Sequence, residues 1–100
     1  MPVTFNQLIN SGQPVLIDFY DPQYRVCKTL LPIIEEVKET MGNRISVLKI
    51  NVSKNKELVH FYKIGNVPTT ILFQNGRQLW RKSGLLSKVE ILLKILEKST

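Results

Sequence analysis

A nearly unbroken apolar run at residues 14–20, PVLIDFY, limits the folds open to this chain more than any other feature. Its β-branched and aromatic side chains, with no regular polar alternation, predict a strand that is buried on both faces. Such a strand lies inside a sheet that other elements cover on both sides. Asp18 is the exception in the run, because an isolated carboxylate in apolar surroundings is costly and its pKa should rise.

Two further segments predict the rest of the sheet. Residues 45–52 have the apolar content of a second buried strand. Residues 69–74 and 77–82 flank Asn75-Gly76, the pair that best tolerates the positive φ angles of a type I′ turn. These two segments therefore predict a hairpin of fixed register.

Segments with helical spacing alternate with these strands, at residues 4–10, 26–41, 55–62 and in a last helix after Ser87. Thr4 and Ser87 are the predicted N-caps of the first and last helices. In the last helix the apolar spacing predicts a buried stripe of Val89, Leu92, Leu93 and Leu96. The order helix, strand, helix, strand, helix, hairpin, helix predicts an α/β fold, with one mixed sheet flanked by helices on both faces.

The length and charge of the chain limit the number of domains and the kinds of partner that we expect. One hundred residues predict a single domain spanning residues 1–100. The net charge of +6 is spread from Arg25 to Lys98, which is typical of an ordinary solvated surface. A positive net charge also favours acidic protein or peptide partners. Basic residues interleaved with exposed aromatics are not evident, so we expect no nucleic-acid partner. The apolar runs fall far short of the roughly 20 residues that span a bilayer, and we expect a monomer without a membrane partner.

The cysteine and histidine counts bear on disulfides and metals. The one cysteine, Cys27, rules out an internal disulfide, and with one histidine an all-protein zinc site would need carboxylate ligands. We therefore expect neither a structural metal nor a cofactor. The chain does not begin with a basic segment followed by an apolar stretch, so the cytoplasm is the default localisation.

Several short strings, in their order and spacing, resemble the thioredoxin family over nearly the whole chain. They are PVLIDFY, Cys27-Lys28, Pro32 inside a helix, Lys49-Ile50-Asn51, Val67-Pro68-Thr69 and Phe73-Gln74-Asn75-Gly76. The resemblance implies a thioredoxin fold and a thiol-disulfide oxidoreductase scaffold that serves cell redox homeostasis. In this family the second helix opens with Trp-Cys-Gly-Pro-Cys. The matching residues 23–27 read QYRVC here.

This altered turn lacks the thiol that starts dithiol exchange. Tyr24 stands where the family has its attacking cysteine, and a phenol with a pKa of about 10 forms no disulfide. Cys27 occupies the position of the resolving cysteine, which the resemblance implies is buried. Reduction of disulfides by a dithiol is therefore not expected. Thioredoxin reductase would be a partner only of a dithiol form.

The resemblance implies roles for other residues around this turn. Asp18 matches a buried aspartate that exchanges protons with the resolving thiol, and Lys49 matches its partner on the neighbouring strand. The two are equally consistent with an ion pair that is retained without a catalytic role. The Val67–Pro68 peptide bond is implied to be cis, and the backbone before Pro68 to pair with an extended substrate. Arg25 would make the rim of the turn basic and favour acidic peptides.

Three functional hypotheses follow from these residues. The first is a non-catalytic module that binds peptides or proteins in the groove beside Pro68. The second is a thioredoxin whose active turn, residues 23–26, was altered by design or selection. The third is monothiol exchange through Cys27, which requires an accessible thiol. A buried Cys27 would instead act as a small inert hydrophobe.

Overall fold

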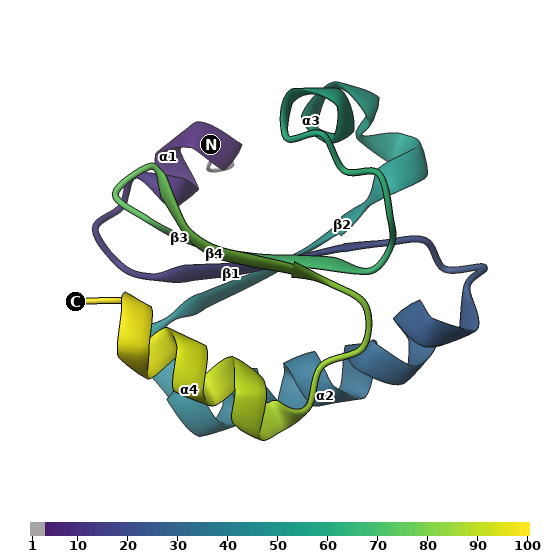
Figure 1. The fold of residues 1–100 in the computed structure, drawn as a ribbon. Helices are drawn as coiled ribbons and strands as arrows, with labels where there is room; N and C mark the ends of the chain where they lie inside the picture. Colours follow the sequence, from purple (N-terminus) through teal and green to yellow (C-terminus); the bar gives the residue numbers. More distant parts are fainter. Residues whose placement is uncertain (1–3) are drawn as a thin grey trace.

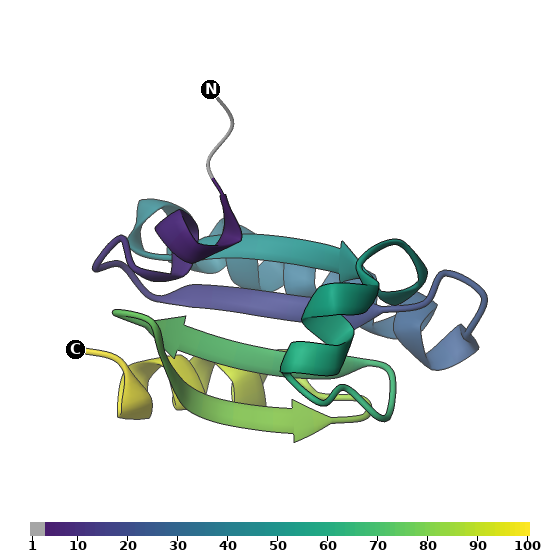
Figure 2. The same cartoon turned by 90° about the horizontal axis from the view of Figure 1, so that it is seen from above.

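The apolar run of the sequence forms a strand inside a four-stranded sheet. The computed structural model describes residues 4–100, and its sheet has the order β2-β1-β3-β4. These strands are β1 (Val15–Tyr20), β2 (Ser46–Asn51), β3 (Thr69–Gln74) and β4 (Arg77–Ser83). β1 pairs in parallel with β2 and antiparallel with β3, and β3 pairs antiparallel with β4 (Figure 2). The predicted mixed sheet is therefore confirmed.

Helices cover both faces of this sheet, as the buried strand requires. Helices α1 (Phe5–Ile9) and α3 (Lys56–Phe61) lie on one face, and α2 (Arg25–Met41) and α4 (Lys88–Lys98) lie on the other (Figure 1). Two short 3₁₀ turns follow α2 and β2. None of the helices described between residues 4 and 100 is long and apolar enough to cross a membrane.

The alternation of side chains along β1 divides the core into two layers. Leu16 packs into the layer between the sheet and helices α2 and α4, with Leu30, Ile34 and Ile91. The side chains that alternate with it pack into the layer on the α1 and α3 side, where the buried residues are Ile9, Val15, Ile17, Phe19, Ile50, Ile64, Ile71 and Phe73. Asp18 alternates with these residues, so its carboxylate faces the α2 and α4 layer.

The local sequence signals for helix starts and for the hairpin are confirmed. Thr4 and Ser87 each form a capping box with the residue three positions on. Asn75 and Gly76 have φ angles of +53° and +78°, as a type I′ turn requires. The four strands and the first three helices begin and end within two residues of the predicted limits, and the last helix begins directly after Ser87 as predicted.

The buried stripe predicted for the last helix is wrong at three of its four positions. Val89, Leu93 and Leu96 are 63%, 53% and 67% exposed, and Ile91 and Ile95 are buried in their place. Leu92 is partly buried against the α2 and α4 layer. The physical reason is that α4 carries aliphatic side chains on most of its circumference. The apolar spacing therefore fits two faces, and contact with the sheet selects the one with the two isoleucines.

Candidate functional site

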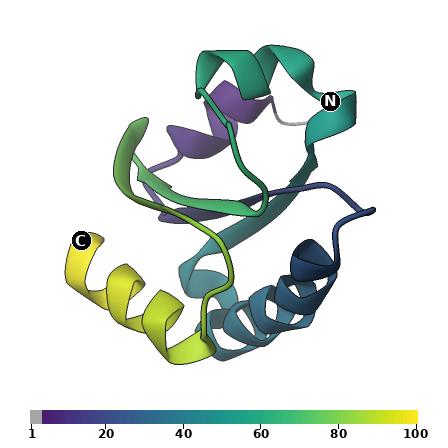
Figure 3. The ribbon, with the colours of Figure 1, turned by 45° about the vertical axis from the view of Figure 1, so that its right-hand side comes forward.

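Three chain connections meet at one end of the sheet. They are the turn from β1 to α2, the loop from α3 to β3 and the loop from β4 to α4 (Figures 1 and 3). The strand register explains the meeting, because Phe19 near the end of β1 lies opposite Thr69 at the start of β3. Thr69 in turn lies opposite Ser83 at the end of β4. Residues from all three connections therefore share one surface.

Tyr24 is the exposed residue at the start of α2. It is the N-cap of the helix, it makes no side-chain capping bond, and the residue is 55% exposed. Asp21 shapes the turn before it, because the Asp21 carboxylate accepts a hydrogen bond from the Gln23 amide at 2.9 Å. The Tyr24 amide donates to the Asp21 carbonyl at 3.1 Å. The turn therefore presents a phenol to solvent at the start of α2.

Cys27 lies one turn deeper and has no exposed surface. Its Sγ accepts a hydrogen bond from the Asp21 amide at 3.5 Å. Burial is the main cause that raises the pKa of this thiol above its ordinary value. The nearby charges of Asp18 and Asp21 add to the rise, and the Asp21 amide opposes it. The thiolate that disulfide exchange requires is therefore disfavoured, and reagents have no direct access to it.

A polar row crosses the sheet beneath α2. Lys49, Asp18 and Thr70 lie opposite one another on β2, β1 and β3. Both carboxylate oxygens of Asp18 and the Thr70 hydroxyl are buried and have no hydrogen-bond partner within residues 4–100. The Lys49 ammonium is instead hydrogen-bonded to the Glu35 carboxylate of α2. Burial raises the pKa of Asp18 to about 6, and the Lys49 charge lowers it by a smaller amount.

A groove of about 370 Å³ opens between the β1–α2 turn and the α3–β3 loop. Its wall includes Tyr24 on one side and Val67 on the other, and the Val67–Pro68 peptide bond is cis. Its other lining residues are Asp21, Val52, Ser53, Val59, Ile64, Gly65 and Asn66. Neither the amide nor the carbonyl of Val67 has a hydrogen-bond partner among the described residues.

Contacts from β4 hold the α3–β3 loop in place. The Arg81 guanidinium donates to the carbonyl of Tyr62 at 2.5 Å and to that of Lys63 at 2.8 Å. The Gly84 amide donates to the carbonyl of Pro68 at 2.8 Å. The backbone on both sides of Val67 is therefore anchored, while its own polar groups stay free.

A second contact ties this loop to the end of β4. The Thr69 hydroxyl donates to the Asn66 carbonyl at 2.6 Å, so it accepts the hydrogen bond that it shares with the Ser83 hydroxyl at 2.8 Å. Arg81, Thr69 and Ser83 were not predicted from the sequence. Their partners lie in other elements, and no local pattern identifies them.

Comparison with known proteins agrees with this arrangement. Residues 2–97 match the family model described as Thioredoxin. This chain belongs to the thioredoxin family. The thioredoxin of Rickettsia typhi is 36% identical over 87 residues, which cover 87% of this chain and 83% of that protein. Thioredoxin Y1, chloroplastic, of Arabidopsis thaliana is 38% identical over 88 residues, which cover 88% of this chain and 51% of that protein.

A solved thioredoxin supports the same fold. A single-residue mutant of the thioredoxin from Halobacterium salinarum NRC-1 superposes with a TM-score of 0.87 at 27% identity. The superposition covers 100% of this chain and 87% of that structure. The thioredoxin fold expected from the sequence is confirmed.

The structure gives a place to each residue that was predicted for the thioredoxin-like site. Tyr24 and Val67 line one groove, Pro68 follows Val67, and Arg25 is exposed beside Tyr24. Cys27 and Asp18 are buried beneath this surface, and Lys49 is half exposed and paired with Glu35. Among residues 4–100, no three His, Cys, Asp or Glu side chains are close enough together to hold a metal ion.

Proposed function

We propose that this thioredoxin-family chain is a non-catalytic module that binds an extended segment of a protein partner in the groove beside Val67. The observation that carries the proposal is the contrast between the two parts of the site. The groove is open to solvent, whereas the one thiol has no exposed surface. Binding is therefore the activity for which the site is ready without rearrangement.

Thiol chemistry is less well supported. Dithiol exchange needs a second sulfur to release the mixed disulfide, and Tyr24 provides none. Monothiol exchange through Cys27 needs the thiolate to reach a disulfide, but burial hides the thiol and raises its pKa. Both alternatives require a change in the site, whereas peptide binding does not.

The groove has the features by which a protein recognises an extended peptide. The free amide and carbonyl of Val67 can pair with the peptide backbone, as in strand addition to a sheet edge. Val52, Val59 and Ile64 supply apolar wall for a peptide side chain. The exposed Tyr24 ring adds a flat surface with a polar tip, a combination that is enriched at interfaces.

The test is selection of peptides on the purified chain, followed by binding measurements with variants. Val59→Trp fills the groove, and we expect it to weaken binding about tenfold or more, because it excludes an apolar side chain. Val89→Trp is the matched control, since Val89 is exposed on α4 on the opposite face of the sheet. Equal affinities of these two variants for the selected peptide would overturn the proposal.

A further inference from the structure

We propose that the segment bound in this groove is acidic, with an apolar residue in the groove and Asp or Glu residues on both sides of it. This inference rests on the proposed function and names the class of partner. Its basis is the distribution of basic and acidic side chains around the groove.

Basic residues bracket the groove along the chain. Arg25 follows Tyr24, Lys54 follows Ser53, and Lys63 precedes Ile64. All three basic side chains are exposed, and none forms an ion pair within residues 4–100. These basic residues are therefore sequence neighbours of groove-lining residues and have no acidic partner of their own.

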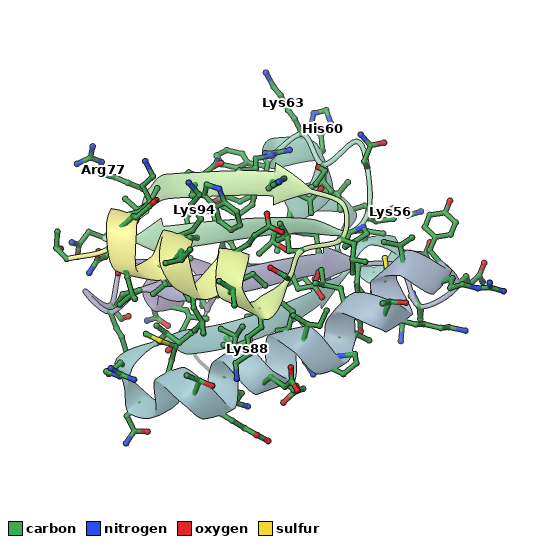
Figure 4. The ribbon with its side chains drawn as sticks, turned by 60° about the horizontal axis from the view of Figure 1, so that its bottom comes forward. Lys56, His60, Lys63, Arg77, Lys88 and Lys94 are labelled. Carbon is green, nitrogen blue, oxygen red and sulfur yellow. The ribbon has the colours of Figure 1, made fainter. Side chains whose placement is uncertain are left out.

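The hollows next to the groove extend the basic rim. One hollow shares Ser53 with the groove and is lined by Lys54 and Lys56. Another shares Val59, Ile64 and Gly65 with the groove and is lined by His60 and Lys63. Lys56, His60 and Lys63 are labelled in Figure 4. The side chains of Lys54, Lys56 and Lys63 thus lie along the continuations of the groove rather than on a separate face.

Acidic residues compensate little of this charge. Asp21 lines the groove, but its single negative charge is outnumbered by the positive charges of the lysines that line the neighbouring hollows, Lys54, Lys56 and Lys63. Glu57 lines one of the neighbouring hollows. By contrast, the lysine–glutamate ion pairs among residues 4–100 lie on the other face of the sheet, where they join Lys49 to Glu35, Lys82 to Glu90 and Lys94 to Glu97. Part of the net charge of +6 is therefore left uncompensated around the groove.

The same groove favours a peptide over a nucleic acid. An apolar wall and an unpaired backbone amide and carbonyl suit a chain with alternating side chains and its own amides. A nucleic acid would use the basic rim but would leave these groups unmatched. A peptide therefore requires the open groove, whereas a nucleic acid requires only the basic residues around it.

The experiment compares three peptides that share one selected apolar core, flanked by Glu, by Gln or by Lys. We expect the Glu-flanked peptide to bind about tenfold more tightly than the Gln-flanked peptide at low salt, and the ratio to shrink as salt rises. Equal affinities of these two peptides would overturn the acidic preference alone. Failure of all three to bind would instead reject the proposed function.

Charge-reversal variants test whether the preference for an acidic peptide comes from the basic residues beside the groove. Lys54→Glu and Lys63→Glu should each weaken the Glu-flanked peptide about three- to tenfold. Arg77→Glu makes the same change in net charge at the opposite end of the sheet from Lys56 (Figure 4), and should change affinity less than about twofold. Equal losses in all three variants would overturn the proposal. A competition experiment with a single-stranded oligonucleotide adds a further test. If the oligonucleotide displaces the peptide and also binds the Val59→Trp variant as tightly as the wild type, the proposal is overturned in favour of a nucleic acid.

Discussion

The Lys49 ammonium lies on the strand next to Asp18 but is hydrogen-bonded to Glu35 on α2. The Asp18 carboxylate is therefore buried without a hydrogen-bond partner among residues 4–100. The positive charge of Lys49 stabilises the ionised carboxylate only through space. Burial has the larger effect and raises the pKa of Asp18. This carboxylate should destabilise the fold whenever it is ionised.

The first prediction concerns pH. The pKa of Asp18 is raised from 3.8 to about 6 in the folded chain, so the folded state binds the proton more tightly than the unfolded state. The stability that this proton contributes is fully present below pH 3.8 and is lost as pH rises through 6. The loss in the free energy of unfolding between these two pH limits amounts to about 3 kcal/mol.

Denaturant unfolding of the wild type and of Asp18→Asn at a series of pH values tests this prediction. The free energy of unfolding of Asp18→Asn relative to wild type should increase as pH rises from about 4 to about 7, and other carboxylates cancel in the difference. A constant difference over this range would contradict the prediction.

The second prediction concerns the thiol. Because Cys27 is fully buried, a thiol reagent at neutral pH should label the native chain at least about a hundredfold more slowly than the unfolded chain, since labelling must wait for an opening of the structure. Mass spectrometry of the labelled protein over time gives both rates. Rapid labelling of the native chain would favour monothiol exchange over the binding function.

The third prediction concerns Arg81, which holds the carbonyls of Tyr62 and Lys63. Arg81→Ala should lower stability by about 1–2 kcal/mol, because two charged hydrogen bonds at an exposed site are lost. It should also speed hydrogen exchange of amides 63–67 and weaken peptide binding, and Arg81→Lys should restore part of each. Arg77→Ala on the same strand is the control, and equal exchange in both alanine variants would show that Arg81 does not position the loop.

The fourth prediction compares two faces of α4. Ile95→Ala should lower the free energy of unfolding by about 2–4 kcal/mol, because it leaves a cavity in the core. Leu93→Ala should change it by less than about 0.5 kcal/mol, because Leu93 is 53% exposed. Thermal or denaturant unfolding measures both, and a large cost at Leu93 would mean that this side chain is covered in solution.

The fifth prediction concerns the altered turn. Replacing Tyr24, Arg25 and Val26 together by Cys, Gly and Pro would place a second thiol at the N-cap of α2, where the helix dipole favours a thiolate. This variant should reduce insulin disulfides in the presence of a dithiol reductant, and the matching variant with Ser at position 24 should not. An inactive dithiol variant would mean that the surrounding surface no longer serves disulfide exchange.

Features set by neighbouring residues were predictable from the sequence. The apolar run of β1, the Asn75-Gly76 turn and the capping residues Thr4 and Ser87 depend on contacts within a few positions, and all are confirmed. The family resemblance added the positions of Cys27 and the residues around Pro68. The burial of that cysteine and the cis bond agree with what it implied.

Features that depend on distant partners were not predictable. Lys49 could face Asp18 or Glu35, and only the packing of α2 on the sheet decides between them. The two hydrogen bonds of Arg81 reach Tyr62 and Lys63, which precede it by 19 and 18 positions. No local sequence pattern marks these contacts. The exposed apolar face of α4 was not predicted because aliphatic residues form two adjacent faces of the helix, and only one of them packs on the sheet. The functional roles of Asp18, Lys49 and Cys27 remain predictions.

The contacts between the α3–β3 loop and the residues at the end of β4 also depend on the order in which the chain is synthesised. Both the guanidinium of Arg81 and the amide of Gly84 come after the loop in the chain, so they leave the ribosome after it. A growing chain that ends before Arg81 already contains every residue that lines the groove, yet it lacks the contacts that fix their positions. The contacts that hold the α3–β3 loop can therefore form only after the chain has been synthesised past Gly84, when all four strands of the sheet are present.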